Sequence, residues 1–212
     1  MTINPGAPPP AGGFALLASG ANFSCEVLLA LIDRDYRPRI LALPEYPPAA
    51  GGALTASNLI EDSPERPLLK LGQGIEIAYV PAVAQADFAS QVERRGIEFL
   101  LIACWPYLIE PRLVESASKA ALNLHPSLLP RYRGPDPLTQ QLTLGDSDFG
   151  VSLHLLSQRF DRGDIVAQAQ LPNSTAQAQR SMLERCCARQ GVDLFIEAIE
   201  SYPEWSPVTQ AD

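Results

Sequence analysis

From Phe14 onward, short apolar runs alternate with amphipathic segments along the chain. Short continuous apolar runs are typical of strands buried on both faces, and apolar positions spaced by three and four residues are typical of helices. The pattern therefore predicts that strands and helices alternate. It places strands at 14–18, 39–43, 75–80, 98–103, 121–124, 151–156 and 165–171, and helices at 24–34, 88–95, 110–119 and 176–200.

The first and the last expected helix have the clearest apolar faces. In the first, Ser24 is a candidate N-cap, because a serine hydroxyl accepts a hydrogen bond from a free amide at a helix start. The positions that we expect to face the core are Val27, Leu28, Leu31 and Ile32 in the first helix, and Met182, Leu183, Leu194, Phe195 and Ile199 in the last.

Strands that alternate with helices are typical of a mostly parallel sheet with helices on both faces, a three-layer Rossmann-like α/β fold. Ligands of such sheets bind beyond the carboxyl ends of the strands. Asn123 and His125 lie at the carboxyl end of the strand expected at 121–124, so we expect a site there. Gly20 stands alone after the first strand, without a G-x-G-x-x-G or P-loop motif, so nothing predicts nicotinamide or ATP.

The two ends of the chain differ from the part between them. Residues 1–13 contain four prolines and three glycines, which predicts a flexible tail. Residues 14–205 are long enough for one domain with a core of its own. We expect residues 206–212 to form a short C-terminal tail.

Composition narrows the choice of partners and location. The net charge of −8 argues against a protein that holds nucleic acid by charge, and Arg131 with Arg133 is the only short basic pair near the histidines. The sequence contains no stretch typical of a membrane span or of a signal peptide. The cysteines have no metal-ligand spacing, so we expect free, buried thiols and a cytoplasmic location. They are Cys25, Cys104, Cys186 and Cys187.

The two histidines of the chain, His125 and His154, both lie within residues 123–164. Histidine exchanges protons near neutral pH, so it is frequent in acid-base and oxyanion chemistry. The same stretch contains Asn123, Asp161 and a Pro/Gly-rich loop. Taken singly, Asn123 and Asp161 are more often turn residues, so the functional interpretation depends on the combined motif.

The combined motif is long. It consists of Asn-x-His-Pro-Ser-Leu-Leu-Pro from Asn123 to Pro130, Tyr132, Gly134, Gly145-Asp146, Gly150-x-x-x-His154 and Asp161-x-Gly163. This set resembles the folate-dependent formyltransferases, which include enzymes acting on methionyl-tRNA, glycinamide ribonucleotide and amino sugars, and a formyltetrahydrofolate deformylase. A weaker resemblance in the order of elements covers most of residues 14–200. The resemblance implies the formyltransferase fold, a role in one-carbon metabolism and 10-formyltetrahydrofolate as the formyl donor.

The resemblance also implies that Asn123, His125 and Asp161 are the catalytic residues. When an amine attacks the formyl carbon, negative charge develops on the formyl oxygen. We expect His125, as a hydrogen-bond donor, and the amide NH₂ of Asn123 to stabilise that oxygen. We expect Asp161 to hold His125 in its charged form and to relay the proton of the amine.

By the same resemblance, the loop after the strand at 98–103 and the loop at 157–164 hold the folate. Backbone amides would pair with the pteridine edge, and apolar side chains would cover its face. We expect His154 to support the catalytic residues, and the alternative is that it has a purely structural role. For Trp105 and Tyr107 the alternative to folate binding is packing within the core. The expected folate-binding residues are Trp105, Tyr107, Leu108, Ile109, His154, Ser157 and Phe160.

A metal site built from His125, His154 and Asp161 is a weaker alternative. Their separations match no common zinc signature, and no glutamate follows a histidine at the position that such sites use. We therefore predict no metal.

The acceptor is the least determined part of the prediction. After Gly20 the chain lacks the glycine-rich phosphate turn of the glycinamide ribonucleotide enzymes, and residues 182–191 lack their late Glu-His-x-x-Tyr-Pro signature. Segments 23–32 and 183–196 resemble the methionyl-tRNA enzymes, but the acidic charge and the end of the chain at Asp212 argue against tRNA. By elimination we expect a small amine, such as an amino sugar or an amino-acid derivative. Hydrolysis of the folate and folate binding without catalysis are the alternatives.

Overall fold

Seven strands form one sheet in the computed structural model, which describes residues 13–45, 65–83, 85–172 and 179–211. The strands are β1 (Phe14–Ala18), β2 (Ile40–Glu45), β3 (Glu76–Pro81), β4 (Phe99–Ala103), β5 (Ala120–His125), β6 (Gly150–Leu155) and β7 (Ile165–Gln170). Their order in the sheet is β3-β2-β1-β4-β5-β6-β7. Strands β1 to β5 are parallel, and β6 is antiparallel to both of its neighbours, β5 and β7.

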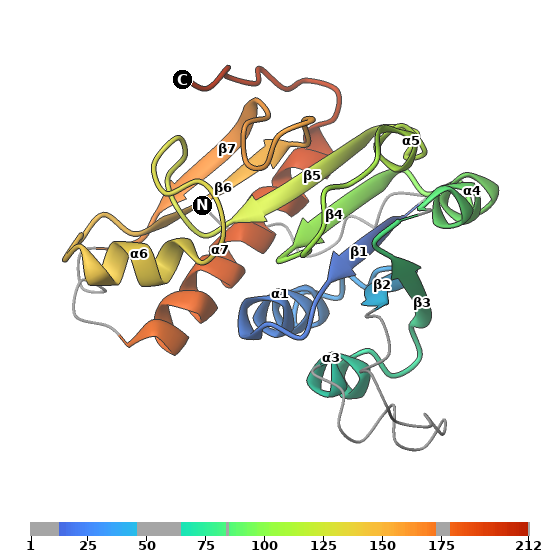
Figure 1. Cartoon of the computed structure of the whole chain (residues 1–212), viewed down its shortest axis with the longest axis horizontal. Coiled ribbons are helices and arrows are strands. Elements are labelled where there is room, and N and C mark those ends of the chain that lie inside the picture. Colours follow the sequence, from blue (N-terminus) through green and yellow to red (C-terminus); the bar gives the residue numbers. More distant parts are fainter. Residues whose placement is uncertain (1–12, 46–64, 84, 173–178, 212) are drawn as a thin grey trace.

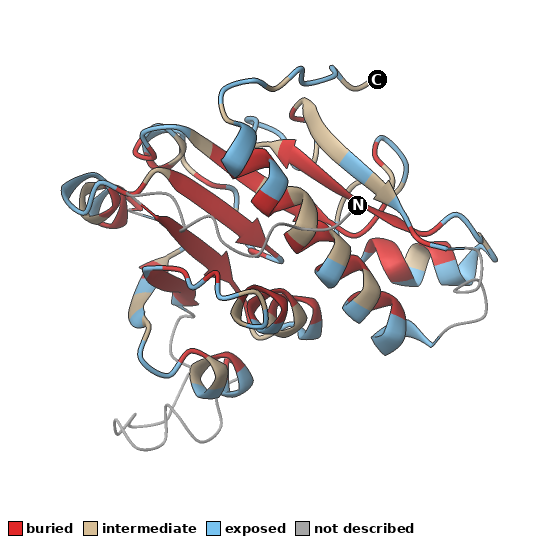
Figure 2. Cartoon of the chain, turned by 180° about the vertical axis from the view of Figure 1, so that it is seen from behind, coloured by how far each residue is buried: buried red, intermediate tan, exposed pale blue. Residues whose placement is uncertain are grey.

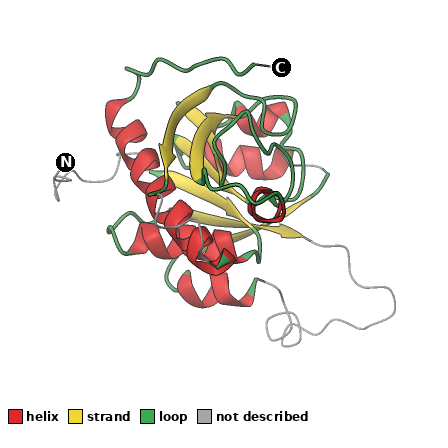
Figure 3. Ribbon diagram, turned by 90° about the vertical axis from the view of Figure 1, so that its left-hand side faces the viewer, coloured by secondary structure: helices red, strands yellow, loops and turns green. Residues whose placement is uncertain are grey.

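Helices cover both faces of the sheet (Figures 1 and 3). The helices are α1 (Asn22–Ile32), α3 (Arg66–Leu71), α4 (Ala86–Arg94), α5 (Pro111–Val114), α6 (Pro137–Thr143) and α7 (Arg180–Ser201). One core cluster joins the sheet to α1, α3, α6 and α7, and a second joins it to α4 and α5. This three-layer α/β arrangement confirms the expected fold class.

The central strand β1 shows why the apolar runs become strands. Its side chains alternate between the two core clusters, Phe14 and Leu16 on one face and Ala15 and Leu17 on the other, and all four are fully buried. Figure 2 shows the same burial along the central strands. Strands covered on both faces are apolar at every position, which is the pattern that the sequence contains.

Two details of the expected helices are wrong. Ser24 is not an N-cap, because α1 begins earlier and Ala21 occupies the cap position. The buried Ser24 hydroxyl instead donates to the carbonyl of Ala103, over 2.8 Å, and joins α1 to the end of β4. The helix expected at 110–119 is only the short α5, because the chain turns there and the Ser116 hydroxyl donates to the carbonyl of Leu113 over 2.7 Å.

Two helices, α3 and α6, were not expected from the sequence. Asp136 caps α6, since its side chain accepts from the Thr139 amide, and Pro137 follows at the first helical position. In α7, Met182 is 52% exposed because it lies on the outer face of the helix, so its expected place in the core is wrong. The other apolar positions of α7 are buried or half-buried: Leu183, Leu194, Phe195 and Ile199.

The expected tail at residues 1–13 lies outside the described residues except for Gly13, whose carbonyl accepts from the Glu98 amide. Most of the Pro/Gly-rich stretch after β2 also lies outside them. At the other end, Val208 forms an antiparallel bridge with Ile165 at the start of β7. None of the described helices is long and apolar enough to cross a membrane.

All four cysteines are free, as expected. The expectation that they are buried is correct only for Cys187; Cys25 and Cys186 are half-buried and Cys104 is exposed. Cys104 is exposed because it follows β4 directly, where the sheet ends and the chain enters a loop.

Candidate active site

A cavity of about 860 Å³ opens beyond the carboxyl ends of β1, β4 and β5. This is the position in which parallel α/β sheets bind ligands. Every site residue that the sequence indicated lines this one cavity. They are Asn123, His125 and Asp161 as the expected catalytic residues, with Trp105, Tyr107, Leu108, Ile109, His154, Ser157 and Phe160 around them.

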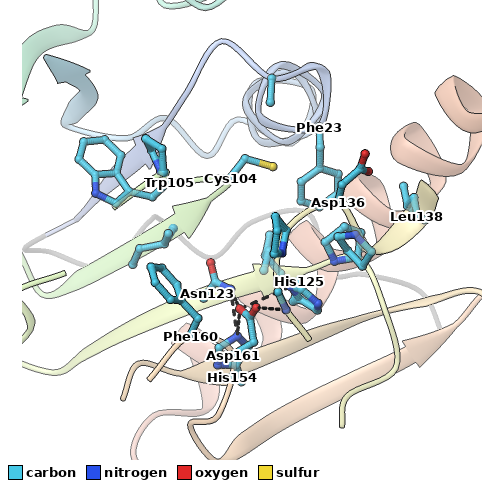
Figure 4. A pocket seen from close by; sticks show the side chains of 18 of the residues that line it. Phe23, Cys104, Trp105, Asn123, His125, Asp136, Leu138, His154, Phe160 and Asp161 are labelled. Atoms are coloured by element: carbon cyan, nitrogen blue, oxygen red, sulfur yellow. Dashed lines mark hydrogen bonds and ion pairs between the residues drawn. The ribbon is translucent and has the colours of Figure 1, made fainter. Parts of the chain in front are cut away.

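Sheet register brings Asn123 and His154 together. They are direct partners across the antiparallel pair of β5 and β6, and the Asn123 Nδ2 lies 2.9 Å from the His154 Nε2. The loop between β6 and β7 then returns Asp161 to the same point, with its Oδ1 3.4 Å from the Asn123 Nδ2 and 3.6 Å from the His154 Nε2 (Figure 4). The expected trio therefore meets in space although Asp161 lies far along the chain.

His125 is the last residue of β5, and its side chain is only 6% exposed. Its Nε2 donates to the carbonyl of Tyr132 over 2.7 Å, and its Nδ1 lies 3.5 Å from the Asp161 Oδ1. Burial lowers the pKa of His125, while Asp161 and the Tyr132 carbonyl oppose this shift and His154 adds to it. The pKa stays below its usual value because burial is the largest effect.

The Asp161 carboxylate is an ionised group inside the cavity wall, 13% exposed. Its Oδ2 accepts from the Gly134 amide over 2.9 Å. Burial raises the pKa of Asp161, but the contacts with His154, His125 and the Gly134 amide together outweigh it and hold the pKa below its usual value. Asp161 therefore carries a negative charge at neutral pH.

Both ring nitrogens of His154 have hydrogen-bond partners. Its Nδ1 donates to the carbonyl of Leu155 over 2.8 Å, so its Nε2 is free to accept from the Asn123 amide. The side chain is 1% exposed. His154 therefore contacts Asn123 from the side of β6. It also turns the NH₂ of Asn123 toward His154 and Asp161 in this conformation.

A buried hydroxyl fixes the loop that follows His125. Ser152, on β6, donates to the Ser127 carbonyl over 2.6 Å and accepts from the Leu129 amide and from the Gln168 Nε2. The Gln141 side chain holds the Pro126 carbonyl from the other side. The Pro-Ser-Leu-Leu-Pro part of the motif thus attaches the end of β5 to its neighbours.

Unusual backbone conformations concentrate at this site. Among the described residues other than glycine, five have a positive φ, and four of them border the site: Cys104, Tyr132, Asp136 and Asp161. Such conformations persist where the surroundings fix them, and they are frequent at functional sites. For Asp161, φ is +54°, which directs the carboxylate toward the two histidines.

The cavity has two ends of different character. Figure 4 shows Trp105 and Phe160 on one side of the catalytic cluster and Phe23, Asp136 and Leu138 on the other. The first end is aromatic and apolar. The second end also contains polar residues that the sequence did not indicate, namely Asn22, Arg180 and Glu184.

Glu184 and Arg180 escaped prediction because they lie on α7, far from the motif in sequence. Glu184 is 6% exposed, and it accepts from the Asn22 Nδ2 and from the Arg180 Nε. Arg180 also pairs with Asp136 over 2.8 Å. No sequence signal marks Glu184, because the burial of a glutamate is visible only in the fold.

The weaker metal alternative has no geometric support. Among the described residues, no group of three or more His, Cys, Asp or Glu side chains is arranged to hold a metal ion.

Comparison with known proteins agrees with the motif. The family model described as formyl transferase matches residues 61–199. Methionyl-tRNA formyltransferase of Limosilactobacillus fermentum is 29% identical over 181 residues, which are 84% of this chain and 54% of that protein. The same enzyme of Treponema pallidum is 30% identical over 152 residues, 69% of this chain and 47% of that protein. The chain spans about half the length of the curated relatives that it matches.

Solved structures of low sequence identity share the fold. Phosphoribosylglycinamide formyltransferase from Bacillus halodurans has a TM-score of 0.62 at 18% identity, covering 90% of this chain and 99% of that one. A formyltetrahydrofolate deformylase from Pseudomonas syringae has a TM-score of 0.61 at 16% identity, covering 93% and 65%. Since the family model alone spans more than half of the sequence, the chain belongs to the folate-dependent formyl transferase family.

Proposed function

We propose that this protein transfers a formyl group from 10-formyltetrahydrofolate to the amine of a small acceptor. The observation that carries the proposal is the convergence of Asn123, His125 and Asp161 in the wall of one cavity. In the reaction the amine nitrogen bonds to the formyl carbon, and the bond from that carbon to N10 of the folate breaks. The amine loses a proton, and N10 gains one.

The aromatic end of the cavity fits the folate. Trp105 and Tyr107 pack edge to face, with ring centroids 6.1 Å apart, and Phe160 is 57% exposed toward the same end. Aromatic rings in a cavity wall offer the apolar surface that a flat heterocycle covers. A volume of about 860 Å³ lies within the range of small-molecule sites, roughly 300–1,000 Å³.

His125 acts through its Nδ1. Because the Tyr132 carbonyl holds the Nε2 hydrogen, Nδ1 carries a hydrogen only in the charged ring. Because the pKa of His125 lies below its usual value, the neutral ring is the main form at pH 7. The charged ring that donates to the formyl oxygen is the minor form, and Asp161 stabilises it across 3.5 Å. The ring is buried, so this donor acts without competition from bulk water.

Asn123 supplies the second donor. Its Nδ2 lies 2.9 Å from the His154 Nε2 and 3.4 Å from the Asp161 Oδ1. A hydrogen bond of 3.4 Å is weak, so its hydrogen is available to a formyl oxygen placed between the two residues. Catalytic hydrogen bonds are often long without substrate and shorten in the complex.

Asp161 accepts the proton that the attacking amine loses. Its lowered pKa keeps it ionised, and it lies within reach of both histidines at the cavity wall. A carboxylate close to His125 returns the proton by way of that ring or of a water molecule toward N10.

The polar end of the cavity supports a small acceptor. Glu184 and Asp136 lie there with Arg180, so two carboxylates face one guanidinium, which suits an acceptor that carries an amine and other polar groups. The nearby Arg131 is paired with Asp146 and Asp148. Arginines neutralised in this way are poorly suited to a phosphate backbone, which binds through unpaired cations.

Methionyl-tRNA is the second candidate acceptor. It is favoured by the relatives, since the curated proteins named above are methionyl-tRNA formyltransferases. The two candidates share the same donor and the same three catalytic residues, so the acceptor end alone separates them.

The test is an acceptor screen that follows release of tetrahydrofolate from 10-formyltetrahydrofolate. Separate arms contain amino sugars, amino acids and their derivatives, methionyl-tRNA, or buffer alone. Turnover that depends on a small amine supports the proposal, and turnover with methionyl-tRNA only supports the second candidate. Full-rate turnover in buffer alone identifies a hydrolase and contradicts transfer.

Variants separate catalysis from binding. We expect Asn123→Ala to lower kcat by roughly 10²–10³-fold, as with other oxyanion donors, while 10-formyltetrahydrofolate still binds. We expect Glu184→Gln to raise KM for the acceptor and to leave KM for the folate unchanged, because Glu184 lies at the polar end. Unchanged turnover in Asn123→Ala would contradict the proposed catalytic role and favour folate binding without catalysis.

We also propose a cytoplasmic location. All four cysteines are free thiols, which is the usual state in a reducing compartment.

A further inference from the structure

The C-terminal segment 206–211 lies against the loop that carries Asp161. Val208 is fixed to the first residue of β7 by two hydrogen bonds with Ile165, of 2.9 and 2.8 Å. Beyond it, Thr209 and Ala211 are exposed, but Gln210 is half-buried. One side chain of an otherwise exposed segment therefore turns inward.

The amide of Gln210 uses both of its ends. Its Nε2 donates to the carbonyls of Asp161 and Gly163, over 3.0 and 2.7 Å. Its Oε1 accepts from the Nε and Nη2 of Arg133, over 3.1 and 2.9 Å. An amide side chain has two donor hydrogens and two acceptor lone pairs, so this residue is fully engaged. Arg133 also donates to the Ala211 carbonyl over 2.6 Å.

The two turns that Gln210 joins are those that position the Asp161 carboxylate. One turn contains Asp161 itself. The other runs from Arg133 to Gly134, and the Gly134 amide donates to the Asp161 Oδ2 over 2.9 Å. The Arg133–Gly134 turn thus holds the carboxylate of Asp161. Gln210 holds the backbone of Asp161 and is itself bound to the Arg133–Gly134 turn.

The turn of Asp161 needs such support. Its φ of +54° is uncommon for a residue other than glycine and persists only where the surroundings fix it. On the inner side the turn already touches β6, since a Cβ placed on Gly163 would lie 1.7 Å from the carbonyl oxygen of Leu155. Gln210 contacts the carbonyls of the same turn, so the turn is held by β6 and by the C-terminal segment together.

We propose that Gln210 is a positioning residue for formyl transfer, which holds the Asp161 turn and the Arg133–Gly134 turn together so that the Asp161 carboxylate stays beside His125. This inference rests on the catalytic role proposed for Asp161. Gln210 does not line the cavity, so it acts on the reaction through the two turns that it holds.

The alternative is that Gln210 only stabilises the fold. The pKa of His125 distinguishes this structural role from the proposed positioning role. The groups that face the His125 ring are Asp161, His154 and the Tyr132 carbonyl, and Asp161 is the one that favours the charged ring by charge. If the carboxylate moves away, the pKa of His125 falls further. A loss of global stability alone leaves that pKa unchanged in the folded protein.

The experiment is an NMR titration of the His125 ring in four proteins: wild type, Gln210→Met, Asp161→Asn and Thr209→Ala. The methionine has the length of glutamine without its hydrogen bonds or any added charge. With only two histidines in the chain, a His154→Gln variant assigns the signals. We expect the His125 pKa to fall in Gln210→Met and in Asp161→Asn, and to match wild type in Thr209→Ala, whose residue is exposed.

Turnover gives the second readout, with 10-formyltetrahydrofolate and the best acceptor of the screen, and with buffer alone in a parallel arm. We expect Gln210→Met to lower kcat by roughly tenfold to a hundredfold, since small displacements of catalytic groups have effects of that order, and to leave KM for the folate unchanged. The double variant with Asp161→Asn should be no slower than Asp161→Asn alone, because Gln210 acts through Asp161.

The outcomes separate this inference from the proposed function. If Asp161→Asn lowers the His125 pKa and abolishes turnover but Gln210→Met changes neither, the positioning role is wrong and the proposed function stands. If Asp161→Asn itself changes neither, the role proposed for Asp161 fails. A Gln210→Met protein that melts earlier but keeps the wild-type pKa and kcat shows a structural role only, and overturns the inference.

Discussion

The imidazole Nε2 of His125 donates to the main-chain oxygen of Tyr132 over 2.7 Å, which leaves Nδ1 as the ring atom directed at Asp161. Because Nε2 keeps its hydrogen in both charge states, Nδ1 is a donor in the charged ring and an acceptor in the neutral ring. One backbone carbonyl thereby decides which atom of His125 takes part in chemistry.

The stability of the protein should fall as the pH is lowered through the range of His125. Burial holds the pKa of His125 below 6.5, so the unfolded chain binds this proton more readily than the folded one. The folded state therefore loses stability as pH falls below about 6.5, and the loss is complete below the folded pKa. His125→Gln removes this dependence.

Urea unfolding of wild type and His125→Gln between pH 8 and pH 5 measures the effect. We expect the free energy of unfolding of wild type to fall relative to that of His125→Gln as the pH falls. Asp161 has a lowered pKa, so its stabilising contribution is present above its unfolded pKa of about 3.9 and lost only as pH falls toward the folded value. If the free energy of unfolding of wild type stays constant or rises relative to that of His125→Gln, His125 is not a buried histidine with a lowered pKa.

Replacement of Asp161 by asparagine should remove catalysis and keep the fold. Asparagine has the same shape and also tolerates a positive φ, which Asp161 has at +54°. It lacks the negative charge that stabilises charged His125 and cannot accept the amine proton. We expect kcat to fall by roughly 10²–10⁴-fold, the range for general acid-base residues.

The measurement for Asp161→Asn is paired. Tetrahydrofolate release gives kcat, and quenching of tryptophan fluorescence gives the dissociation constant for 10-formyltetrahydrofolate. The dissociation constant should stay close to wild type, because the aromatic end of the cavity is unchanged. Weaker folate binding in proportion to the lost turnover would mean that Asp161 binds the donor rather than moving a proton.

The Ser152 hydroxyl should contribute measurably to stability. Ser152→Ala leaves the Ser127 carbonyl, the Leu129 amide and the Gln168 side chain without this buried partner. An unsatisfied buried polar group costs about 1–3 kcal/mol, so we expect the free energy of unfolding to fall by about 3 kcal/mol in urea. The exposed Ser118→Ala is the control, expected within about 0.5 kcal/mol of wild type. Equal stability of the two variants would contradict the role of this network.

The fold was predictable where local pattern and burial agree. β1 and β4 are apolar at every position because both faces are covered, so their runs are visible in the sequence. The short helices α3 and α6 were missed because few residues define their periodicity. Asp136 followed by Pro137 is a helix-start signal, but the Pro and Gly residues around it predict a loop.

The site was predictable only where its residues share a contiguous motif. Asn123 and His125 are two residues apart on one strand, so their meeting needs no knowledge of the fold. Glu184 and Gln210 reach the site from α7 and from a segment expected to be a tail, and only tertiary packing brings them there. The pattern of apolar residues specifies the core, whereas the partners of a polar side chain depend on topology.

Gly163 should be required for the placement of Asp161. A Cβ at Gly163 would lie 1.7 Å from the Leu155 carbonyl oxygen and 2.6 Å from its carbonyl carbon, closer than real Cβ contacts. Backbone, unlike a flexible side chain, cannot turn away, so in Gly163→Ala the turn must move off β6. Asp161 lies two residues before Gly163 and moves with it. We expect kcat to fall by roughly a hundredfold, because a displacement of about 1 Å in a catalytic group has that effect.

The control for Gly163→Ala is Gly74→Ala. Gly74 has a φ of +83° and open space around its Cβ position, and it lies between α3 and β3, away from the cavity. Alanine there strains the backbone by about 1 kcal/mol, so stability should fall while kcat stays at the wild-type value. Both variants therefore lose stability, but only Gly163→Ala should lose turnover and shift the NMR signals of His125. Wild-type kcat in Gly163→Ala would show that the Asp161 turn tolerates displacement from β6, against the geometry on which the proposed catalysis depends.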